Sequence, residues 1–373
     1  MKKILIFIDW YTPAFKAGGP ISSIYNLTKF LEEEVNFYIV TSNKDLNSKK
    51  ELQGIKTNTW QQINKSKVIY LDKGFQTKRM LKKIVNDINP DKIYLNGLFS
   101  FFFSILPCYF FNKNFKIIIN PRGMFGSSAL SNKKFKKLLF IKLANITSFY
   151  KNICWHISND AELSELRNNL KVVNKYYIIP NLPKVLKHVN RKRIDNNELR
   201  LISVCRINEI KNLHFVLQIL KDINVKCHYK IIGFIEDHKY YNKLQSIVKL
   251  LPNNIKVDFT GLFKSNKIEK HLNDADLFIS SSLNENYGHS IVESLSSGLP
   301  VLISNNCPWT GLEESFAGFR LKLDKIEFKE KILFFYNLNE DDYKKFNLGA
   351  RTYFNNYISP DLHKNNYLNL LSS

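Results

Sequence analysis

Residues 284–301 read NENYGHSIVESLSSGLPV and decide how the second half of the chain is built. An apolar run at 277–280 precedes the segment, and another apolar run starts at Val301. Between them, apolar residues recur at the spacing of a helix, and Gly298 ends that helix. The segment therefore predicts a strand, a loop, a helix and a second strand, which is the unit of parallel α/β sheets.

The loop of this segment carries polar residues suited to a ligand. Glu285 lies just past the first strand, and Gly288 permits a close backbone approach or an unusual φ angle. His289 or Ser290 opens the helix, which places Glu293 in its first turns. An ionised carboxylate only accepts hydrogen bonds, so Glu293 suits the two hydroxyls of a ribose and Glu285 those of a sugar. The alternative for Glu293 is an ordinary acidic residue that complements the helix dipole.

Upstream, residues 203–213 read SVCRINEIKNL. Arg206 and Lys211 lie five positions apart in the loop after an expected strand, and Asn212 is placed to begin the next helix. Fixed cations beside a helix N-terminus suit a diphosphate. The alternative is that both cations are ordinary solvated loop residues.

Short apolar strands alternate with amphipathic helices along most of the chain, which predicts parallel βαβ units. We expect strands at 3–8, 36–40, 67–71, 92–95, 116–119, 156–158, 201–204, 229–232, 256–259, 277–280 and 301–303. We expect helices at 21–33, 78–87, 133–144, 213–223, 239–250, 267–273, 290–296 and 325–337. The Pro-containing and basic segment 180–197 breaks the alternation and predicts a linker.

The fold class is therefore α/β, with two doubly wound Rossmann-like domains that face a central cleft. Ligands of such sheets bind beyond the carboxyl ends of the strands, so the cleft is the expected site. We expect a first domain at 1–185, a second domain at 186–350, and a C-terminal helix at 351–373 that crosses back to the first domain.

The composition is that of a folded protein with an unusual charge. The 373 residues are 44% hydrophobic, and 55 Lys plus Arg against 33 Asp plus Glu give a formal net charge of +22. The aromatic content excludes wholesale disorder. The charge fits nucleic acid, an anionic membrane surface or a phosphorylated substrate, with part of it expected from compositional drift toward lysine. The five scattered cysteines predict neither a disulfide framework nor a zinc site.

Three loops of the first domain follow expected strands. The pair Gly18 and Gly19 lets backbone amides approach a phosphate or a sugar. Asn96 and Arg122 follow later strands, and we expect both to line the cleft or to meet the acceptor. For Arg122 the alternative is a pair with an acid elsewhere. His156 is either a further acceptor contact or a structural residue of its strand.

Several motifs in order give the sequence a family resemblance that covers nearly the whole chain. Glu285 and Glu293 form an E-x7-E element, and Arg206 with Lys211 lie at the expected distance upstream. The chain thus resembles family-4 retaining glycosyltransferases of the GT-B fold. Cys-Pro-Trp at 307–309 resembles a subgroup that builds bacterial O-antigen, capsule or exopolysaccharide.

The resemblance implies an activity, and it makes 1–185 the acceptor-side domain and 186–350 the nucleotide-sugar-binding domain. It also implies a role for each motif residue. Arg206, Lys211 and Glu285 form the implied catalytic set, in which the two cations hold the donor diphosphate. The implied donor-binding residues are Gly18, Gly19, Gly288, His289, Ser290 and Glu293. The implied reaction is retaining transfer from a nucleoside-diphosphate sugar, with UDP or GDP, to a saccharide hydroxyl. We expect the saccharide to be linked to polyprenyl diphosphate, and we expect no cofactor.

Asp274 and Asp276 match the D-x-D pattern that binds a metal in the other glycosyltransferase fold. Here the pattern precedes a strand and shares no loop with a Gly-rich phosphate cradle. We therefore predict that Asp276 is structural and that the enzyme needs no metal.

Residues 130–151 contain six Lys and no acidic residue. A basic amphipathic helix from Lys133 to Lys142 predicts contact with an anionic membrane surface. The family resemblance implies that this surface is the inner face of the bacterial cytoplasmic membrane, with the protein peripheral to it. The alternative is a core-facing helix with a solvated basic face. Two other functions stay open: a sugar-nucleotide 2-epimerase on the same fold, and a basic nucleic-acid-binding protein. We expect no nucleic-acid partner, because no recognition motif for nucleic acid is present.

Overall fold

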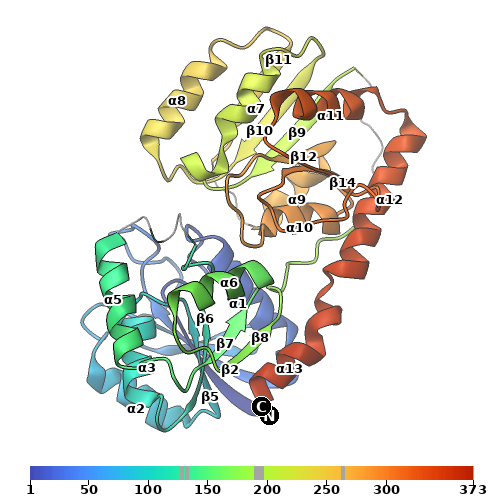
Figure 1. Ribbon diagram of the computed structural model, residues 1–373. Coiled ribbons are helices and arrows are strands. Elements are labelled where there is room, and N and C mark those ends of the chain that lie inside the picture. The colour runs from blue at the N-terminus through green and yellow to red at the C-terminus, as the bar shows by residue number, and fades with distance from the viewer. Residues whose placement is uncertain (127–129, 131–133, 189–196, 262–264, 373) are drawn as a thin grey trace. The chain divides into compact units, whose positions relative to one another are not determined.

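The computed structural model describes residues 1–126, 130, 134–188, 197–261 and 265–372. It divides into two compact units, Met1–Leu182 with Pro360–Ser373 (unit 1) and Pro183–Ser359 (unit 2). Each unit is built on a largely parallel sheet with helices around it (Figure 1). The predicted α/β class is thereby confirmed. No helix among the described residues is both long enough and apolar enough to cross a bilayer.

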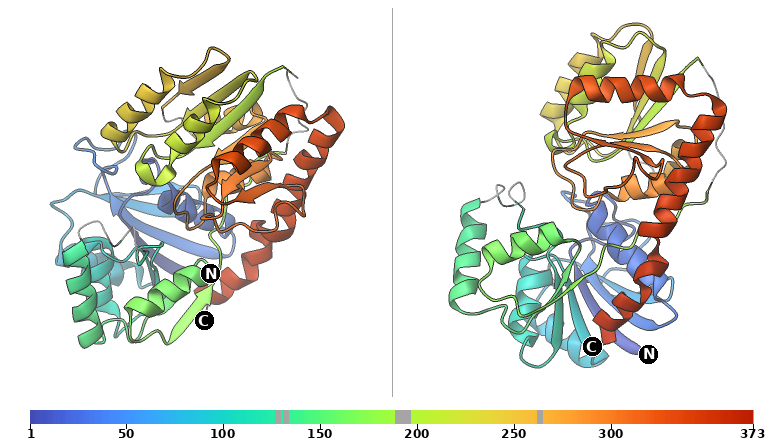
Figure 2. Two further views of the ribbon diagram at one scale, coloured as in Figure 1. Left: turned by 45° about the horizontal axis from the view of Figure 1, so that its top comes forward. Right: turned by 45° about the vertical axis from the view of Figure 1, so that its right-hand side comes forward.

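Within its described residues, unit 1 has an eight-stranded sheet in the order β3-β4-β2-β1-β5-β6-β7-β8. All neighbouring strands are parallel except β3 and β4. The strands are β1 Lys2–Ile8, β2 Val35–Ser42, β3 Trp60–Ile63, β4 Ser66–Leu71, β5 Lys92–Asn96, β6 Lys116–Asn120, β7 Cys154–Ile157 and β8 Lys175–Ile178. Helices lie on both faces of the sheet (Figure 2), so a central strand such as β1 is buried along its apolar run.

The helices of unit 1 begin at recognisable caps. Thr77 accepts a hydrogen bond from Met80 N at 3.2 Å before α2, and Asn159 accepts one from Glu162 N at 2.9 Å before α6. Gly18 precedes α1 in the left-handed region, at φ +64°. The bounds are α1 Gly19–Phe30, α2 Lys78–Ile88, η1 Phe101–Ile105, α3 Leu106–Phe111, α5 Lys134–Ile146 and α6 Asp160–Asn169.

Within its described residues, unit 2 has a six-stranded parallel sheet in the order β11-β10-β9-β12-β13-β14. The strands are β9 Leu199–Val204, β10 Cys227–Ile232, β11 Ile255–Phe259, β12 Leu277–Ser280, β13 Val301–Ser304 and β14 Gly318–Leu321. The helices are η2 Glu209–Lys211, α7 Leu213–Leu220, α8 His238–Val248, α9 Ser265–Asn273, α10 His289–Ser296, α11 Lys325–Asn337 and α12 Glu340–Tyr357. Consecutive side chains of β9 point to opposite faces of the sheet. Leu201 packs in the hydrophobic core that contains α7, and Ile202 packs in the core that contains α10.

The last residues of the chain belong to unit 1. Helix α12 continues through position 350, where we expected a boundary, and the chain joins unit 1 at Pro360 through η3 Pro360–His363 and α13 Lys364–Ser372. Tyr367 donates a hydrogen bond to Pro180 O, and Lys92 Nζ donates one to Leu370 O, each at 2.8 Å. The two termini consequently lie side by side in every view (Figures 1 and 2).

Candidate functional site

Lys211 and Glu285 are in direct contact at the carboxyl edge of the sheet of unit 2. Lys211 lies in the loop after β9, and Glu285 lies in the loop after the neighbouring strand β12. Lys211 Nζ donates a hydrogen bond to Glu285 Oε2, and both side chains are largely buried. Burial has the largest single effect and lowers the pKa of Lys211. The charge of Glu285, the charge of Cys205 and the hydrogen bond to Glu285 together outweigh burial and leave the pKa above its ordinary value. Lys211 is therefore a fixed cation at physiological pH.

Main-chain bonds hold the two loops together. Leu283 N donates to Ile210 O at 2.8 Å, and Ser281 Oγ donates to Asn212 O at 2.8 Å. Asn212 adopts φ +51° between η2 and α7, as an asparagine readily does. The contact of Lys211 with Glu285 is thus supported by a backbone connection between adjacent strand ends.

Arg206 lies in the same loop and has a carboxylate partner of its own. Its Nη1 donates to Glu236 Oε1 at 2.7 Å, and the Asn208 amide donates to the other oxygen of Glu236. Glu236 lies between β10 and α8, and the sequence analysis did not single it out, because an isolated loop Glu has no distinguishing pattern. Burial raises the pKa of Cys205 to about 11, and the nearby charges of Lys211 and Arg206 both oppose that rise. The positive charges of Arg206 and Lys211 therefore both reach the loop that contains Cys205.

Gly288 sets the start of α10. It lies at φ +77°, and a Cβ there would lie 2.8 Å from Ile291 Cδ1 and 3.2 Å from Glu285 Cγ. Only glycine combines this conformation with this space. His289 and Ser290 are the first residues of α10, at the end of the helix that carries a positive partial charge.

Glu293 occupies the second turn of α10 without a hydrogen-bond donor. Its carboxylate accepts no bond from any residue that the structure describes, and the side chain is partly buried. Burial raises the pKa of Glu293 to about 7, against an opposing effect of Lys184. Glu293 is therefore a carboxylate with its acceptor capacity unused.

Residues 186–353, which contain all of these side chains, match the family model described as Glycosyl transferases group 1. This stretch therefore resembles a glycosyltransferase group 1 domain. It covers nearly all of unit 2.

Two curated relatives share parts of the sequence. An uncharacterized glycosyltransferase of Methanocaldococcus jannaschii is 27% identical over 260 residues, which are 66% of this chain and 63% of the relative. The alpha-monoglucosyldiacylglycerol synthase of Streptococcus pneumoniae is 32% identical over 113 residues, which are 30% of this chain and 26% of the relative. The chain therefore matches less than two thirds of the length of each.

The fold is shared over the full length with a solved protein. HepE of Anabaena, solved in complex with UDP and glucose, superposes with a TM-score of 0.75 at 14% identity, covering 100% of both chains. At this identity the likeness shows the fold alone, which is that of two Rossmann-like α/β units as in GT-B glycosyltransferases.

In unit 1, outside the matched stretch, Gly18 and Gly19 begin α1. A Cβ on Gly18 would meet nothing within 4 Å, so the glycine is required by its positive φ rather than by a close neighbour. The backbone carbonyl of Gly18 accepts from Ile21 N at 3.0 Å. The predicted binding of the donor by this pair stays a prediction.

Asn96 and Arg122 come together at the carboxyl edge of the sheet of unit 1. Arg122 Nε donates to Asn96 Oδ1 at 2.6 Å. No acidic side chain among the described residues forms an ion pair with Arg122, so the alternative of a structural pair with an acid is not what the fold contains.

His156 lies in the core of unit 1 and is only 1% exposed. Tyr94 OH is 2.7 Å from its Nδ1, and Ile179 O is 2.9 Å from its Nε2. Burial lowers the pKa of His156 to about 3, and the charge of Arg122 acts in the same direction. The expectation that His156 lines the site is therefore corrected: β7 places the ring in the interior, where both nitrogens already have partners.

Asp276 is structural, as predicted. It accepts from Arg200 Nη2 at 2.6 Å and from Arg200 Nε at 3.0 Å. Asp274 lines a cavity of about 140 Å³ with Arg200 and Lys230, at the amino ends of the strands and so at the opposite edge from Lys211. No group of three metal-ligating side chains occurs in the described parts of the chain. Metal independence stays a prediction.

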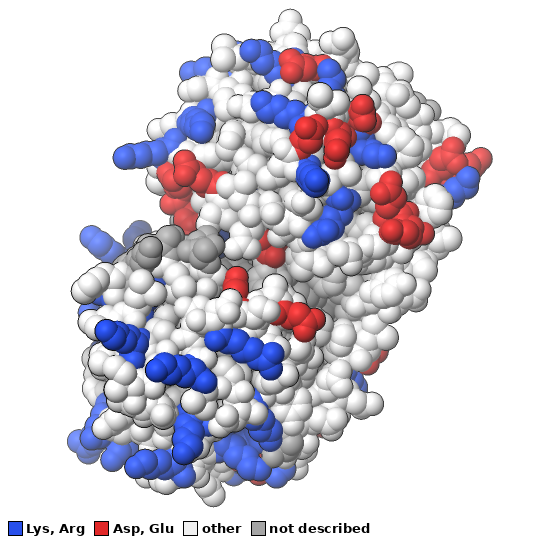
Figure 3. Space-filling model, in the orientation of Figure 1, with Lys and Arg blue, Asp and Glu red and all other residues white. Residues whose placement is uncertain are grey.

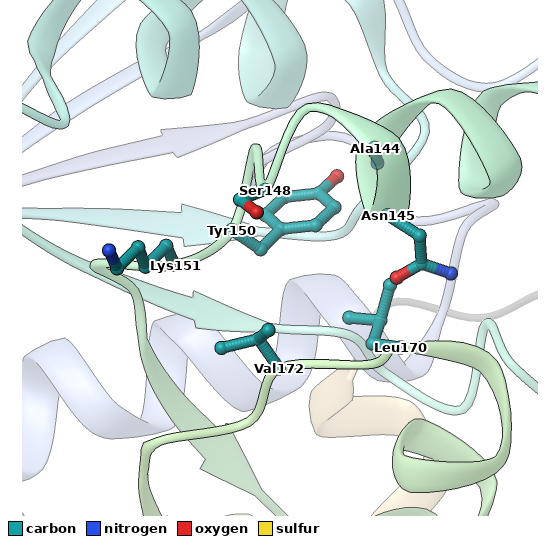
Figure 4. Close-up of a pocket in the computed structure, with 7 residues that line it drawn as sticks. All are labelled: Ala144, Asn145, Ser148, Tyr150, Lys151, Leu170 and Val172. Atoms are coloured by element: carbon teal, nitrogen blue, oxygen red, sulfur yellow. The ribbon is translucent and has the colours of Figure 1, made fainter.

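A second hollow lies beside the end of α5 (Figure 4) and has a volume of about 10 Å³, room for about one water molecule. It is lined by Ala144, Asn145, Ser148, Tyr150, Lys151, Leu170 and Val172. It is too small for a nucleotide or a sugar.

Proposed function

We propose that the chain is a retaining glycosyltransferase that moves a sugar from a nucleoside-diphosphate sugar to a hydroxyl of a saccharide acceptor. The observation that carries the proposal is the largely buried contact of Lys211 with Glu285, beside Arg206, in the stretch that matches the group 1 family model. Fixed cations at a strand edge stabilise the charge that develops on a leaving diphosphate. The complex of HepE with UDP and glucose supports UDP as the nucleotide, and GDP is the other candidate.

The proposed chemistry is mostly positioning and electrostatic stabilisation. Arg206 and Lys211 hold the diphosphate, Glu293 accepts the ribose hydroxyls, and Glu285 accepts a hydroxyl of the donor sugar. Both carboxylates are thereby used in donor binding, so we do not assign them to the carboxylate pair, roughly 5–5.5 Å apart, of a double displacement. We therefore favour a front-face route, in which an oxygen of the leaving diphosphate takes the proton of the acceptor hydroxyl.

The test is nucleotide binding followed by product analysis. One of UDP, GDP, dTDP and ADP should raise the Tm of the wild type, and Lys211→Ala should remove that shift. The same variant should lower kcat/KM by about 10²-fold or more, because a stabilising charge is lost from the transition state. Lys243→Ala, which removes an exposed charge from α8, is the matched control. Unchanged kcat/KM in Lys211→Ala at limiting donor would refute the assignment.

Two product measurements separate the rival activities. NMR of the product should show the anomeric configuration of the donor, and inversion would remove the retaining part of the proposal. A changed sugar nucleotide formed without any acceptor would identify a 2-epimerase instead. Nanomolar, salt-dependent binding of nucleic acid would favour the third function.

We further propose that the acceptor is a lipid-linked saccharide of cell-surface polysaccharide assembly and that α5 meets an anionic membrane. The core-facing side of α5 carries Ile141 and Ala144, which are buried. Its exposed side carries large apolar residues, among them Phe135 at 80% and Ile146 at 68% exposure. The whole exposed apolar set is Phe135, Leu138, Leu139, Leu143 and Ile146.

Charge accompanies these apolar residues. Lys136 and Lys142 are exposed on α5, and Lys and Arg side chains gather over the region of α2, α3 and α5 on the face shown in Figure 3. Lys133 itself lies outside the described residues. Exposed apolar side chains interleaved with lysine fit the interface of an anionic bilayer. The relative from Streptococcus pneumoniae, named as a synthase of a glycosylated diacylglycerol, supports a lipid environment.

Vesicle flotation tests the surface. Wild type should float with phosphatidylglycerol vesicles and far less with phosphatidylcholine vesicles. Phe135→Ser with Ile146→Ser should abolish flotation, whereas Leu348→Ser, an equally exposed apolar residue on α12, should not. Equal binding to both vesicle types would contradict the role of the lysines.

A further inference from the structure

The guanidinium of Arg122 is held entirely by neutral oxygens. Its Nε donates to Asn96 Oδ1 at 2.6 Å, its Nη1 donates to Asn181 Oδ1, and its backbone N–H donates to Asn120 Oδ1 at 3.0 Å. The residue lies at φ +56°, a conformation that a bulky side chain rarely adopts. Two asparagines thus hold the guanidinium and a third holds the backbone of the same residue, while none of them neutralises the charge.

The side chain keeps donors to spare. Arginine has five N–H groups in a planar fork, and Nη2 of Arg122 has no acceptor among the residues that the structure describes. The side chain is partly exposed, so its free edge is accessible. A fixed guanidinium with an unused edge is the geometry that takes the two oxygens of a carboxylate or a phosphate.

One carboxylate, from α6, contacts the loop of Arg122 and is already engaged. Glu162 is buried, and its Oε1 accepts from Gly123 N while its Oε2 accepts from Ser158 N at 2.7 Å. This bridge ties the loop after β6 to the end of β7. It leaves Ser158 Oγ without a partner, although Ser158 is only 4% exposed. A buried hydroxyl without a partner costs free energy that a ligand oxygen recovers.

We propose that Arg122, whose loop is tied to Ser158 through Glu162, binds an oxyanion of the acceptor, either a phosphate or a carboxylate. The inference rests on the proposed function, because unit 2 already supplies Arg206 and Lys211 for the diphosphate of the donor. A separate uncompensated cation in unit 1 then selects an acceptor that is itself negatively charged. A lipid-linked diphosphate and an acidic sugar both supply that oxyanion.

The most informative variant keeps Arg122 and compensates its positive charge. Asn181→Asp is nearly isosteric and puts a carboxylate on Nη1, so the guanidinium gains an internal counter-ion. Asn114→Asp adds the same charge to the same unit at an exposed position and is the matched control. If Arg122 had only a structural role, Asn181→Asp would not weaken ligand binding, because an ion pair between the introduced carboxylate and Arg122 would replace the hydrogen bond.

The binding measurement uses the full chain with Arg206→Ala and Lys211→Ala. These two substitutions remove the cations that would bind a diphosphate in unit 2. The ligands are geranyl diphosphate and methyl glucuronide. We expect at least one to bind and Asn181→Asp to weaken it by about tenfold or more, with Asn114→Asp within about twofold. If only geranyl diphosphate binds, the acceptor is a lipid-linked diphosphate. If only methyl glucuronide binds, the acceptor carries an acidic sugar. Absence of binding of both, or equal binding in Asn181→Asp, would overturn the proposal.

A parallel titration keeps the two proposals apart. Chains with intact Arg206 and Lys211, with and without Asn181→Asp, should bind the same nucleotide within about twofold. If the wild type binds no nucleotide, the proposed function fails while the result for Arg122 stands. If Asn181→Asp lowers nucleotide affinity about tenfold, Arg122 serves the donor and the inference about the acceptor is wrong.

Discussion

Glu293→Gln should stabilise the ligand-free protein at alkaline pH and impair nucleotide binding at the same time. The carboxylate of Glu293 is partly buried, has no hydrogen-bond donor, and has its pKa raised to about 7 by burial. Glutamine keeps the shape and removes the ionisation. The variant therefore separates the free energy lost by burying the carboxylate charge from the free energy gained by packing the side chain.

The sign and size follow from the raised pKa. A carboxyl that ionises at 4.5 when unfolded and at about 7 when folded holds its proton more tightly in the folded state. The free energy of unfolding consequently falls as pH rises from 4.5 through 7, by at most about 3 kcal/mol. The loss in free energy of unfolding is about 1 kcal/mol at pH 5.5 and close to its maximum at pH 8. The stability advantage of Glu293→Gln over the wild type should therefore grow by about 2 kcal/mol between these two pH values.

The assay is urea unfolding of both proteins at pH 5.5 and pH 8, followed by hydrogen exchange of α10. Glu330→Gln, an exposed residue of α11 in the same unit, controls for the loss of one negative charge. An advantage of Glu293→Gln that is independent of pH, or an equal slope in Glu330→Gln, would refute the reasoning.

The same carboxylate links nucleotide binding to proton release. At pH 7 about half of the Glu293 side chains are protonated, and hydroxyl donors of a ribose favour the ionised form. Calorimetry in two buffers of different ionisation enthalpy should therefore detect about half a proton more released by the wild type than by Glu293→Gln. Equal proton release in both proteins would remove Glu293 from the ribose site.

Two further predictions concern the same unit. Activity should survive EDTA, because Asp276 is committed to Arg200; loss of activity that Mn²⁺ restores would return Asp274 and Asp276 to consideration. Gly288→Ala should destabilise unit 2 by about 1–3 kcal/mol and weaken nucleotide binding, because its Cβ would press on Ile291 and Glu285 at a positive φ. Urea unfolding and nucleotide titration measure both effects, and a neutral Gly288→Ala would show that the loop adapts.

The sequence specified the central elements of the fold most closely. The expected strand 277–280 and the expected helix 325–337 coincide with β12 and α11. Buried parallel strands read as continuous apolar runs, which gives a clear pattern. The edge strands β3 and β8 were missed because their residues are mostly polar or partly exposed. Helix α12 was not anticipated beyond its last part, although Asn339 and Asp342 form a recognisable cap at its start.

The candidate residues could be singled out where they belong to a recognisable motif, and their partners were missed where a single polar residue belongs to no motif. Arg206, Lys211 and Glu285 were singled out from their loops, and the structure places Lys211 against Glu285. Glu236, which pairs with Arg206, comes from the next strand-to-helix loop. Asn181, which binds Arg122 across 59 positions, carries no local signal at all. Long-range hydrogen bonds of single asparagine and glutamate residues leave no periodic trace in a sequence.

The pairing of Lys211 with Glu285 also constrains how the proposed site works. A largely buried lysine without a counter-ion would lose its charge, so Glu285 keeps Lys211 ionised in the empty protein. A diphosphate brings more negative charge to the same ammonium and competes with Glu285 for it. Once Lys211 turns to the diphosphate, the carboxylate of Glu285 regains its acceptor capacity. In the proposed function, one carboxylate thus serves two successive purposes, and the donor exchanges an internal ion pair for its own contacts.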